Sequence, residues 1–220
     1  MIFDFDGTLF DTVKGIHRAL NRLLATEGCR ALSAAEVIPL MSEGSGNFIT
    51  NAFATVGATV AESEVRRLLH LFSDFHEPIS LTHTKLYPGA RQILGRLHAE
   101  GYKLGVCTNK PISPALKLIE AFGLEAFFAG VIGGNSGHGL KPEPGPVLAA
   151  IEALQSKAGQ TVMVGDTIKD VAAARAAGIQ VFAVTFGYAE GPPEELGADG
   201  LIGNFAELPA RIEDLAGNTA

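Results

Sequence analysis

The sequence predicts an α/β fold in which a doubly wound parallel sheet carries an inserted all-helical cap. First, short apolar segments alternate with helix-like segments from about residue 84 onward, which is typical of a parallel sheet covered on both faces. Second, Asp6 lies 102 positions before Thr108, whereas a strand-helix-strand unit needs only about 30 residues. Third, the intervening segment reads almost entirely as helix. We therefore expect an α/β core of residues 1–13 and 84–220 and a helical cap of residues 14–83.

The first elements follow from local patterns. Residues 1–5 read as a short strand that ends at the turn dipeptide Asp6-Gly7. Capping boxes, Ser33 with Glu36 and Thr59 with Glu62, predict that cap helices begin there. Apolar residues recur at helical spacing in the first and last cap helices, at Ile16, Ala19, Leu20, Leu23 and Leu24 and at Val65, Leu68, Leu69, Phe72 and Phe75.

The core elements then alternate along the chain. We expect helices that begin near Pro88, Ser113, Pro146 and Ile168. We expect strands over residues 103–107, 127–132, 161–164 and 180–184, followed by a strand near Leu201 and a helix to about residue 215.

The composition narrows the class of partner. The 220 residues are 47% hydrophobic and 19% charged, as in ordinary globular proteins. The net charge is −7 and no block of Lys or Arg occurs, which argues against nucleic acid and anionic membranes as partners. The longest nearly apolar run, residues 126–134, is too short to span a bilayer. A small anionic substrate remains compatible, because a local metal ion or lysine outweighs a distant, screened field.

The cysteines and histidines indicate ordinary structural residues. Cys29 and Cys107 do not form a disulfide framework, and no basic, apolar leader precedes the first motif. We therefore expect a cytoplasmic protein. Cys107 lies within a predicted strand, which favours a buried, inert thiol over a nucleophile. The six histidines lack metal-ligand spacing, and we interpret them as surface or interface residues.

Polar side chains follow four of the predicted strands, at the edge where open α/β sheets bind ligands. The residues are Asp4, Asp6, Gly7 and Thr8 after the first strand, Thr108, Asn109 and Lys110 after the second, Lys141 after the third, and Asp166, Thr167 and Asp170 after the fourth. Each has an ordinary explanation as a turn, a helix cap or a solvated charge. Capping alone does not predict this set at four separate strand ends, so we interpret the set as an active site.

The residue types indicate metal-assisted phosphate chemistry. Crowded carboxylates repel one another unless they protonate or bind a cation. Carboxylate oxygens suit Mg²⁺, which also accepts oxygens of a substrate phosphate. Hydroxyl, amide and lysine groups suit the remaining phosphate oxygens. Backbone N–H groups around Gly7 and Thr8 could form an additional anion nest.

Four segments carry a resemblance to a known family. The segments DFDGTLFDT, VCTNK, LKPEPGPV and VGDTIKD resemble, in order, the four motifs of the haloacid dehalogenase (HAD) superfamily. The helical insertion resembles the cap that this superfamily places between its first two motifs. The resemblance covers essentially the whole chain, is nearest to the phosphoglycolate phosphatase-like branch, and implies a Rossmann-like core.

The resemblance also implies catalytic roles. Asp4 would attack phosphorus and form an aspartyl-phosphate, and Asp6 would protonate the leaving alkoxide and then deprotonate the attacking water. Thr108 and Lys141 would hold the phosphoryl oxygens, while Thr8 and Asn109 would orient these groups.

The same resemblance implies the metal ligands. Mg²⁺ would be held by the Asp4 carboxylate, the backbone carbonyl of Asp6 and the carboxylate of Asp166, with Asp170 in support. The presence of Asp6 argues against two other activities of the superfamily. Halide-removing members lack this second aspartate, and transport ATPases carry threonine there.

The expected function is that of a Mg²⁺-dependent phosphatase acting on a small phosphorylated metabolite, phosphoglycolate-like, as a monomer or weak homodimer. A phosphomutase acting on a sugar phosphate stays open, and so does a non-enzymatic phosphate-binding module. A lid over the strand ends favours small substrates, so we expect specificity to depend on cap residues near 41–47. The glycines in Gly44-Ser45-Gly46-Asn47 predict a flexible break between cap helices.

Overall fold

A parallel β-sheet forms the centre of the core. The structure is a computed structural model that describes residues 1–217. Within those residues, one sheet has the order β5-β4-β1-β6-β7-β8. Its strands are β1 (Ile2–Phe3), β4 (Leu104–Cys107), β5 (Phe128–Ile132), β6 (Val162–Gly165), β7 (Gln180–Val184) and β8 (Gly200–Ile202). Ile2 of β1 pairs in parallel with Gly105 on one side and with Met163 on the other. The sheet therefore winds outward in two directions from β1, which confirms the predicted fold class.

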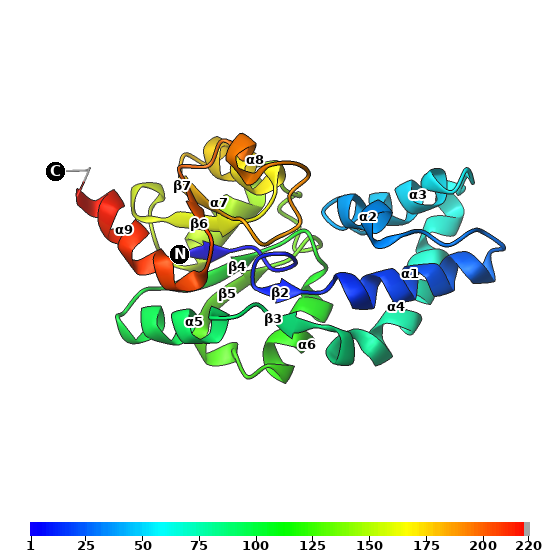
Figure 1. The fold of residues 1–220 in the computed structure, drawn as a ribbon, viewed down its shortest axis with the longest axis horizontal. Coiled ribbons are helices and arrows are strands. Elements are labelled where there is room, and N and C mark those ends of the chain that lie inside the picture. Colours follow the sequence, from blue (N-terminus) through cyan, green and yellow to red (C-terminus); the bar gives the residue numbers. More distant parts are fainter. Residues whose placement is uncertain (218–220) are drawn as a thin grey trace.

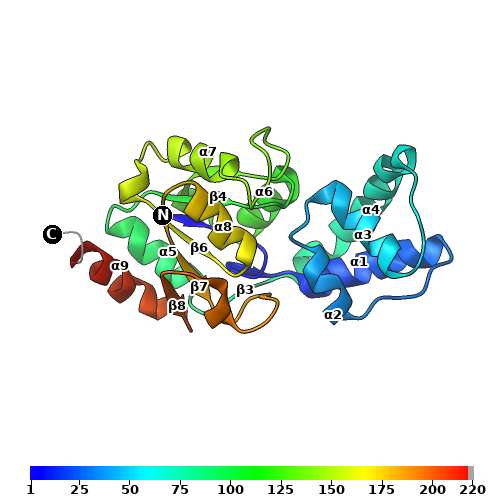
Figure 2. The ribbon, with the colours of Figure 1, turned by 90° about the horizontal axis from the view of Figure 1, so that it is seen from above.

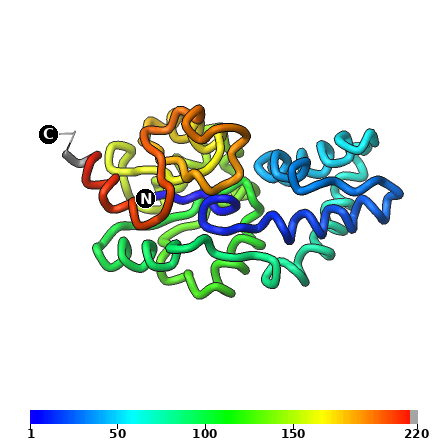
Figure 3. The backbone as a smooth tube through the Cα atoms, viewed as in Figure 1, coloured from blue at the N-terminus to red at the C-terminus, as the bar shows by residue number. Residues whose placement is uncertain are grey.

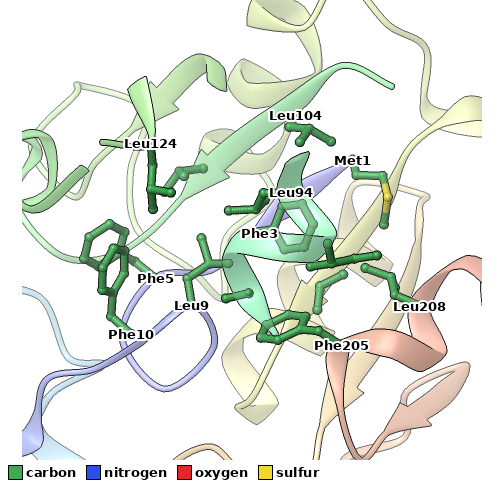
Figure 4. Close-up of a cluster of buried hydrophobic side chains, with 14 of the residues drawn as sticks. Met1, Phe3, Phe5, Leu9, Phe10, Leu94, Leu104, Leu124, Phe205 and Leu208 are labelled. Atoms are coloured by element: carbon green, nitrogen blue, oxygen red, sulfur yellow. The ribbon is translucent and has the colours of Figure 1, made fainter. Parts of the chain in front are cut away.

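Helices cover both faces of this sheet (Figure 1). On one face, α5 (Ala90–Ala99), α6 (Ile112–Ala121) and α9 (Leu208–Gly217) pack over a cluster that contains Phe3, part of which is drawn in Figure 4. On the other face, α7 (Gly145–Ala153) and α8 (Ile168–Ala176) pack over a cluster that contains Ile2. Successive residues of a strand point to opposite faces, so adjacent apolar residues fill two separate cores.

The helical cap lies beside the core, as Figures 1 and 2 show. It consists of α1 (Val13–Thr26), α2 (Ala34–Val37), the short 3₁₀ helix Ile38–Leu40, α3 (Ser45–Thr55) and α4 (Glu62–His83). These helices enclose their own apolar cluster, whose buried members include Leu20, Leu24, Ile49, Phe53 and Leu68. No helix in the described part of the chain, the long α4 included, is apolar enough over sufficient length to cross a membrane.

Two short strands join the helical cap to the core. β2 (Phe10–Asp11) and β3 (Lys85–Leu86) pair antiparallel where the chain leaves the core and where it returns (Figure 3). Sequence analysis did not predict this pair, because a two-residue strand has too few residues for alternation to be recognised. The division of the chain at residues 13/14 and 83/84 stays a prediction.

The starts of the cap helices agree only in part with expectation. The capping box of Ser33 and Glu36 is present at α2. The one expected at Thr59 is wrong: α4 begins at Glu62 after Ala61, and no side chain caps it. The expected break over residues 44–47 is also shorter than predicted, because α3 begins at Ser45. Gly44 precedes that helix with a φ of 78°, a backbone conformation that glycine adopts without steric cost.

The other small 3₁₀ helices lie in the core's connections. They span Glu125–Phe127, Ala158–Gln160, Pro193–Leu196 and Phe205–Glu207. Each is a single short turn, which is the usual use of this helix as a connector.

Candidate active site

The carboxyl ends of the three central strands converge. Asp4 follows β1, Thr108 follows β4 and Asp166 follows β6, and these strands are hydrogen-bonded neighbours. Chain order reverses across β1, so this edge is the topological switch point at which open α/β sheets bind ligands. Lys141 lies in the loop after β5, and Asp170 lies in the first turn of α8.

Lys141 is a buried cation held by three oxygens. Its Nζ lies 2.7 Å from Oδ1 of Asp4 and 2.5 Å from Oδ1 of Asp170, and it donates to the Cys107 carbonyl at 2.9 Å. Burial alone would lower the pKa of Lys141, but the Asp170 and Asp4 carboxylates raise it well above its usual range. Lys141 is therefore a charged group of the site and not a solvated loop residue.

Asp4 is a buried carboxylate with an oxygen that lacks a well-oriented donor. Its Oδ1 forms the ion pair with Lys141 but accepts no hydrogen bond of good geometry from the residues that the structure describes. Burial and then the Asp170 charge raise the pKa of Asp4 to about 7, while Lys141 opposes the shift. The Asp4 N–H donates to the Val164 carbonyl at 2.8 Å, which fixes the backbone against β6. The backbone of Asp4 is thus held in place, and ionisation of its carboxyl group costs more free energy than in water.

Asp166 is fully buried and held from two sides. Its Oδ1 accepts from the Thr8 hydroxyl and its Oδ2 from the Tyr188 N–H, each at 2.8 Å. Burial, and then the charges of Asp170 and Asp4, raise the pKa of Asp166 well above its ordinary value. The predicted orienting residue Thr8 therefore acts on Asp166 in this structure.

Gly7 has to be glycine because of Asp166. Its φ is 87°, and a Cβ at this position would lie 2.1 Å from Oδ2 of Asp166. The Gly7 N–H donates to the Phe10 carbonyl at 2.8 Å, so it is already paired within the turn. Gly7 allows close approach of the first turn to Asp166.

Asp170 both starts a helix and supports Lys141. Its Oδ2 accepts from the Thr167 N–H at 2.9 Å, from the Thr167 hydroxyl at 2.7 Å and from the Asp166 N–H at 3.2 Å. Its Oδ1 accepts from Lys141. Thr167, and not Asp166, is the residue at the N-cap of α8. The Asp170 side chain therefore both caps the start of α8 and holds Lys141 in place.

Three buried carboxylates form a candidate cation site. Ligand oxygens of Asp4, Asp166 and Asp170 all lie within 4.8 Å of one another. The raised pKa values of Asp4 and Asp166 reflect this crowding as well as burial. Hard oxygen donors, and three carboxylates that face the single ammonium of Lys141, fit a Mg²⁺ ion.

Asp6 faces a lysine and a threonine. Its Oδ1 accepts from the Thr12 hydroxyl at 2.6 Å, and the Nζ of Lys110 lies 3.1 and 3.2 Å from its two oxygens. Sequence analysis placed Lys110 in the active-site set, in the same VCTNK segment as Thr108, but assigned it no role. It lies three residues after the end of β4.

Asn109 connects three segments. Its Oδ1 accepts from the Lys141 N–H, and its Nδ2 donates to the Lys141 carbonyl, each at 2.9 Å. The same Nδ2 donates to the cap carbonyl of Ser42 at 2.8 Å. The hydroxyl of the neighbouring Thr108 accepts from the Lys110 N–H at 3.1 Å. Asn109 thus holds the backbone of Lys141 and also contacts the cap, while its role in the reaction stays a prediction.

A cavity of about 350 Å³ opens over these groups, and in this article it is called the phosphoryl cavity. It is lined from the core by Asp4, Asp6, Thr108, Asn109 and Lys141, and from the cap by Ile38, Pro39, Met41 and Ser42. Gly7, Thr8, Asp166 and Asp170 are not part of this lining, and the buried carboxylates lie behind it. The volume matches small-molecule sites, which span roughly 300–1,000 Å³.

Tyr188 is a site residue that sequence analysis missed. Its hydroxyl accepts from the N–H groups of Thr12 and Val13 at 2.8 and 3.1 Å, and donates to Asp11 at 2.9 Å. Because its own N–H holds Asp166, it ties a candidate metal ligand to the start of α1. Applying the strand-end argument to β7 would have directed attention to it.

The chain is similar to known proteins along most of its length. A family model described as haloacid dehalogenase-like hydrolase matches residues 1–184. A phosphoglycolate phosphatase of Rhodospirillum rubrum is 39% identical over 212 residues, covering 94% of this chain and 88% of the relative. A plasmid-encoded phosphoglycolate phosphatase of Cupriavidus necator is 37% identical over 222 residues, covering 96% and 92%.

A solved structure has the same architecture. The crystal structure of a predicted phosphoglycolate phosphatase from Haemophilus somnus 129pt superposes with a TM-score of 0.90 at 26% identity, covering 96% of each chain. The sheet, the helices on both faces and the helical cap are thus shared along nearly the whole length.

Proposed function

Because the chain belongs to the haloacid dehalogenase-like hydrolase family and is a phosphoric monoester hydrolase, we propose that it cleaves a small phosphate ester through an aspartyl-phosphate on Asp4. The observation that carries this proposal is the placement of Asp4. Its buried carboxylate stands at the end of the central strand, against the Lys141 ammonium, and lines the phosphoryl cavity.

In the first half-reaction, Asp4 is the nucleophile. An Asp4 oxygen forms a bond to phosphorus as the bond to the ester oxygen breaks. Lys141 and Thr108 line the same cavity and provide an ammonium and a hydroxyl for the phosphoryl oxygens. Lys141 is held in place by Asp170 and by the Cys107 carbonyl, so its charge is oriented before the substrate arrives.

Asp6 supplies and removes protons. In the first half-reaction its protonated carboxyl gives a proton to the departing alkoxide. In the second, the resulting carboxylate takes a proton from the water that hydrolyses the aspartyl-phosphate and releases inorganic phosphate. Thr12 and Lys110 hold the Asp6 carboxylate in the structure. Asp6 therefore has to give up some of these contacts in order to reach the oxygen of the leaving group.

The metal is proposed to bind among the buried carboxylates. The Asp4 and Asp166 carboxylates and the Asp6 backbone carbonyl would hold Mg²⁺, with Asp170 in support. Bound there, Mg²⁺ would offset the negative charge of the carboxylates and of the incoming phosphate. Thr8 and the Tyr188 N–H would keep Asp166 oriented toward it.

The substrate is proposed to be a small cytoplasmic metabolite. Cap residues from Ile38 to Ser42 line one side of the phosphoryl cavity, which favours a small ester over a phosphoprotein. The names of the relatives make 2-phosphoglycolate the first ester to test. We propose that the enzyme acts as a monomer or weak homodimer.

Phosphate release from a panel of esters tests the proposal. Wild-type protein and Asp4→Asn are assayed with and without Mg²⁺. Release that requires Mg²⁺ and vanishes in Asp4→Asn is the expected result, provided circular dichroism shows that the variant is folded. Retained turnover in Asp4→Asn would remove Asp4 as nucleophile. Intramolecular phosphate transfer without net release would instead indicate a mutase.

A further inference from the structure

Three lysines among the described residues line the phosphoryl cavity, and they differ in what holds them. Lys141 is fixed by two carboxylates and a backbone carbonyl. Lys169 pairs with Glu43 of the cap. In the part of the chain that the structure describes, Lys110 has a single acidic partner, which is Asp6. Lys110 is therefore the lysine of this cavity whose ammonium is bound to the proposed acid and base.

The ion pair of Lys110 and Asp6 is nearly buried. The two side chains are 7% and 13% exposed, and Nζ of Lys110 lies 3.1 and 3.2 Å from the two Asp6 oxygens. A buried pair is costly to break when one partner is left alone. The proposed reaction nevertheless requires the Asp6 carboxyl group to reach the oxygen of the leaving group. An anion that replaces Asp6 at the ammonium would remove most of that cost.

Lys110 combines a fixed backbone with an ammonium that can move. Its N–H donates to the Thr108 hydroxyl at 3.1 Å, and its carbonyl accepts from the Gly134 N–H at 2.8 Å. The ammonium stands at the end of a flexible four-carbon stem. Lys110 and Asp6 line both the phosphoryl cavity and a second cavity of about 310 Å³, whose lining also includes residues of α4 and α6. Open space therefore adjoins the pair, into which the ammonium can turn.

The Asp6 carboxylate shows which kind of anion the Lys110 ammonium accepts. Both Asp6 oxygens lie within hydrogen-bond distance of Nζ, so a carboxylate on the substrate fits the same ammonium. Such an exchange would keep Lys110 paired and would leave the Asp6 carboxyl group bonded to the Thr12 hydroxyl. A neutral alcohol offers no exchange, because it would leave either Asp6 still held or Lys110 buried without an anion.

We propose that Lys110 determines specificity by exchanging partners: a carboxylate on the leaving alcohol takes the Lys110 ammonium, and Asp6 is thereby released to reach the ester oxygen. The inference rests on the proposed phosphatase function. Lys110 acts through its charge and transfers no proton, so the bonds formed and broken at phosphorus are those already described. The lysine thus restrains Asp6 while a neutral ester is bound and frees it for the phosphate ester of a hydroxy acid.

A matched pair of esters tests the exchange. 2-Phosphoglycolate and its carboxamide, 2-phosphoglycolamide, are alike in size and differ in the charge of the alcohol. The measured quantity is kcat/KM for the acid divided by kcat/KM for the amide, so intrinsic differences between the two leaving groups cancel when proteins are compared. Lys110→Met should lower this ratio at least about 10-fold, since a charge-assisted hydrogen bond is lost for the acid alone. Lys110→Arg should recover part of the ratio because it retains a cation.

Lys169→Met is the matched control. Lys169 lines the same cavity, but it pairs with Glu43 and not with Asp6. We expect this variant to change the ratio by less than about threefold, since its pair is more exposed and is remote from the acid and base. Circular dichroism checks that each variant is folded. A ratio that falls in Lys169→Met and not in Lys110→Met would overturn the inference.

The outcomes separate this inference from the proposed function. Equal losses with the acid and the amide in Lys110→Met would mean that Lys110 has only a structural role, and would overturn the inference while leaving the phosphatase intact. A preference of the wild-type protein for the amide would overturn it without any variant. No phosphate release by wild type from either ester or from p-nitrophenyl phosphate, whose leaving group needs no proton, would overturn the proposed function and the inference with it.

Discussion

The core and the cap hold their polar groups in different ways. In the core, Lys141, Asp166 and Asp170 are each fixed by at least two partners at the ends of neighbouring strands. In the cap, the helices enclose an apolar cluster, and the buried Nε2 of His76 has no hydrogen-bond partner among the described residues. The charged groups of the core are thus fixed by one another, whereas the cap is held together mainly by apolar packing.

The two parts meet through few polar contacts. The Ser42 carbonyl accepts from Asn109 at 2.8 Å and from Lys169 at 3.3 Å, and Lys169 also pairs with Glu43. On the other side, the exposed Lys117 pairs with Glu77. Exposed contacts of this kind are individually weak, so we expect them to oppose a movement of the cap only slightly.

The largest effect is expected from Lys141→Met in the core. Removing the ammonium leaves Asp4 and Asp170 without their shared cation, so we expect a loss of about 3–5 kcal/mol in unfolding free energy. Activity should fall by about 10³-fold or more, since a placed charge on the phosphoryl group is lost. Urea unfolding and kcat measure the two effects. Lys117→Met, which breaks an exposed pair, should change stability little, and a comparable loss there would contradict the contrast between the two parts.

Asp6→Ala should slow both half-reactions. General acid and base catalysis contribute roughly 10²–10⁴-fold, so a decrease of that size is expected in kcat. Rapid-quench measurement of the phosphorylated enzyme separates the steps, and the second should slow even when the leaving group needs no proton. Normal rates in both steps would remove the acid and base role from Asp6.

Metal and pH should act together on the stability of the core. The folded state raises the pKa of Asp4 to about 7 from an ordinary 3.8, and also raises that of Asp166. The unfolded chain therefore releases these protons first, so metal-free stability should fall as pH rises from about 4 to 7. Mg²⁺ relieves this repulsion, so it should raise Tm more at pH 8 than at pH 5.

A Tm increase from Mg²⁺ that does not depend on pH would contradict this assignment of the carboxylates. Asp166→Asn should show a smaller increase at pH 8 than wild type. Calorimetry with and without a chelator provides the comparison, and Asp199→Asn, remote from these carboxylates in its pair with Arg175, serves as the control.

The smallest effect is expected at the junction between the parts. Tyr188→Phe removes a hydroxyl that bonds to Thr12, Val13 and Asp11, but keeps the N–H that holds Asp166. We expect a loss of about 1–2 kcal/mol in stability and a fall of only several-fold in kcat/KM. A fall in kcat/KM as large as that expected for Lys141→Met would indicate that Tyr188 takes part in the reaction itself. Tyr102→Phe, at an exposed tyrosine, is the matched control.

The core was predictable from sequence because its signals are local. Asp4, Thr108 and Asp166 each follow an apolar strand directly, and parallel strands bring such residues to one edge. The alternation that places Ile2 and Phe3 in different cores also follows from the strand itself. The roles assigned to these residues stay predictions until they are measured.

The cap and its junction were less predictable because their signals are not local. The burial of His76 depends on which elements pack against α4, the helix that carries both His76 and Phe72, and no spacing among the histidines indicated it. Thr59 matched a capping pattern, yet α4 begins without using it. The Tyr188 hydroxyl bonds to partners more than 170 positions away, which no short motif encodes.

The phosphorylated state of Asp4 is the most direct test of the account. Wild-type protein and Asp6→Ala are mixed with substrate and Mg²⁺, quenched in acid within the first turnover, digested and examined by mass spectrometry. We predict one phosphoryl group on the peptide that contains Asp4, absent from Asp4→Asn, and present in a larger fraction of the Asp6→Ala protein when the leaving group needs no proton. Phosphate release at the normal rate with no phosphoryl group on that peptide, together with activity in Asp4→Asn, would contradict the mechanism.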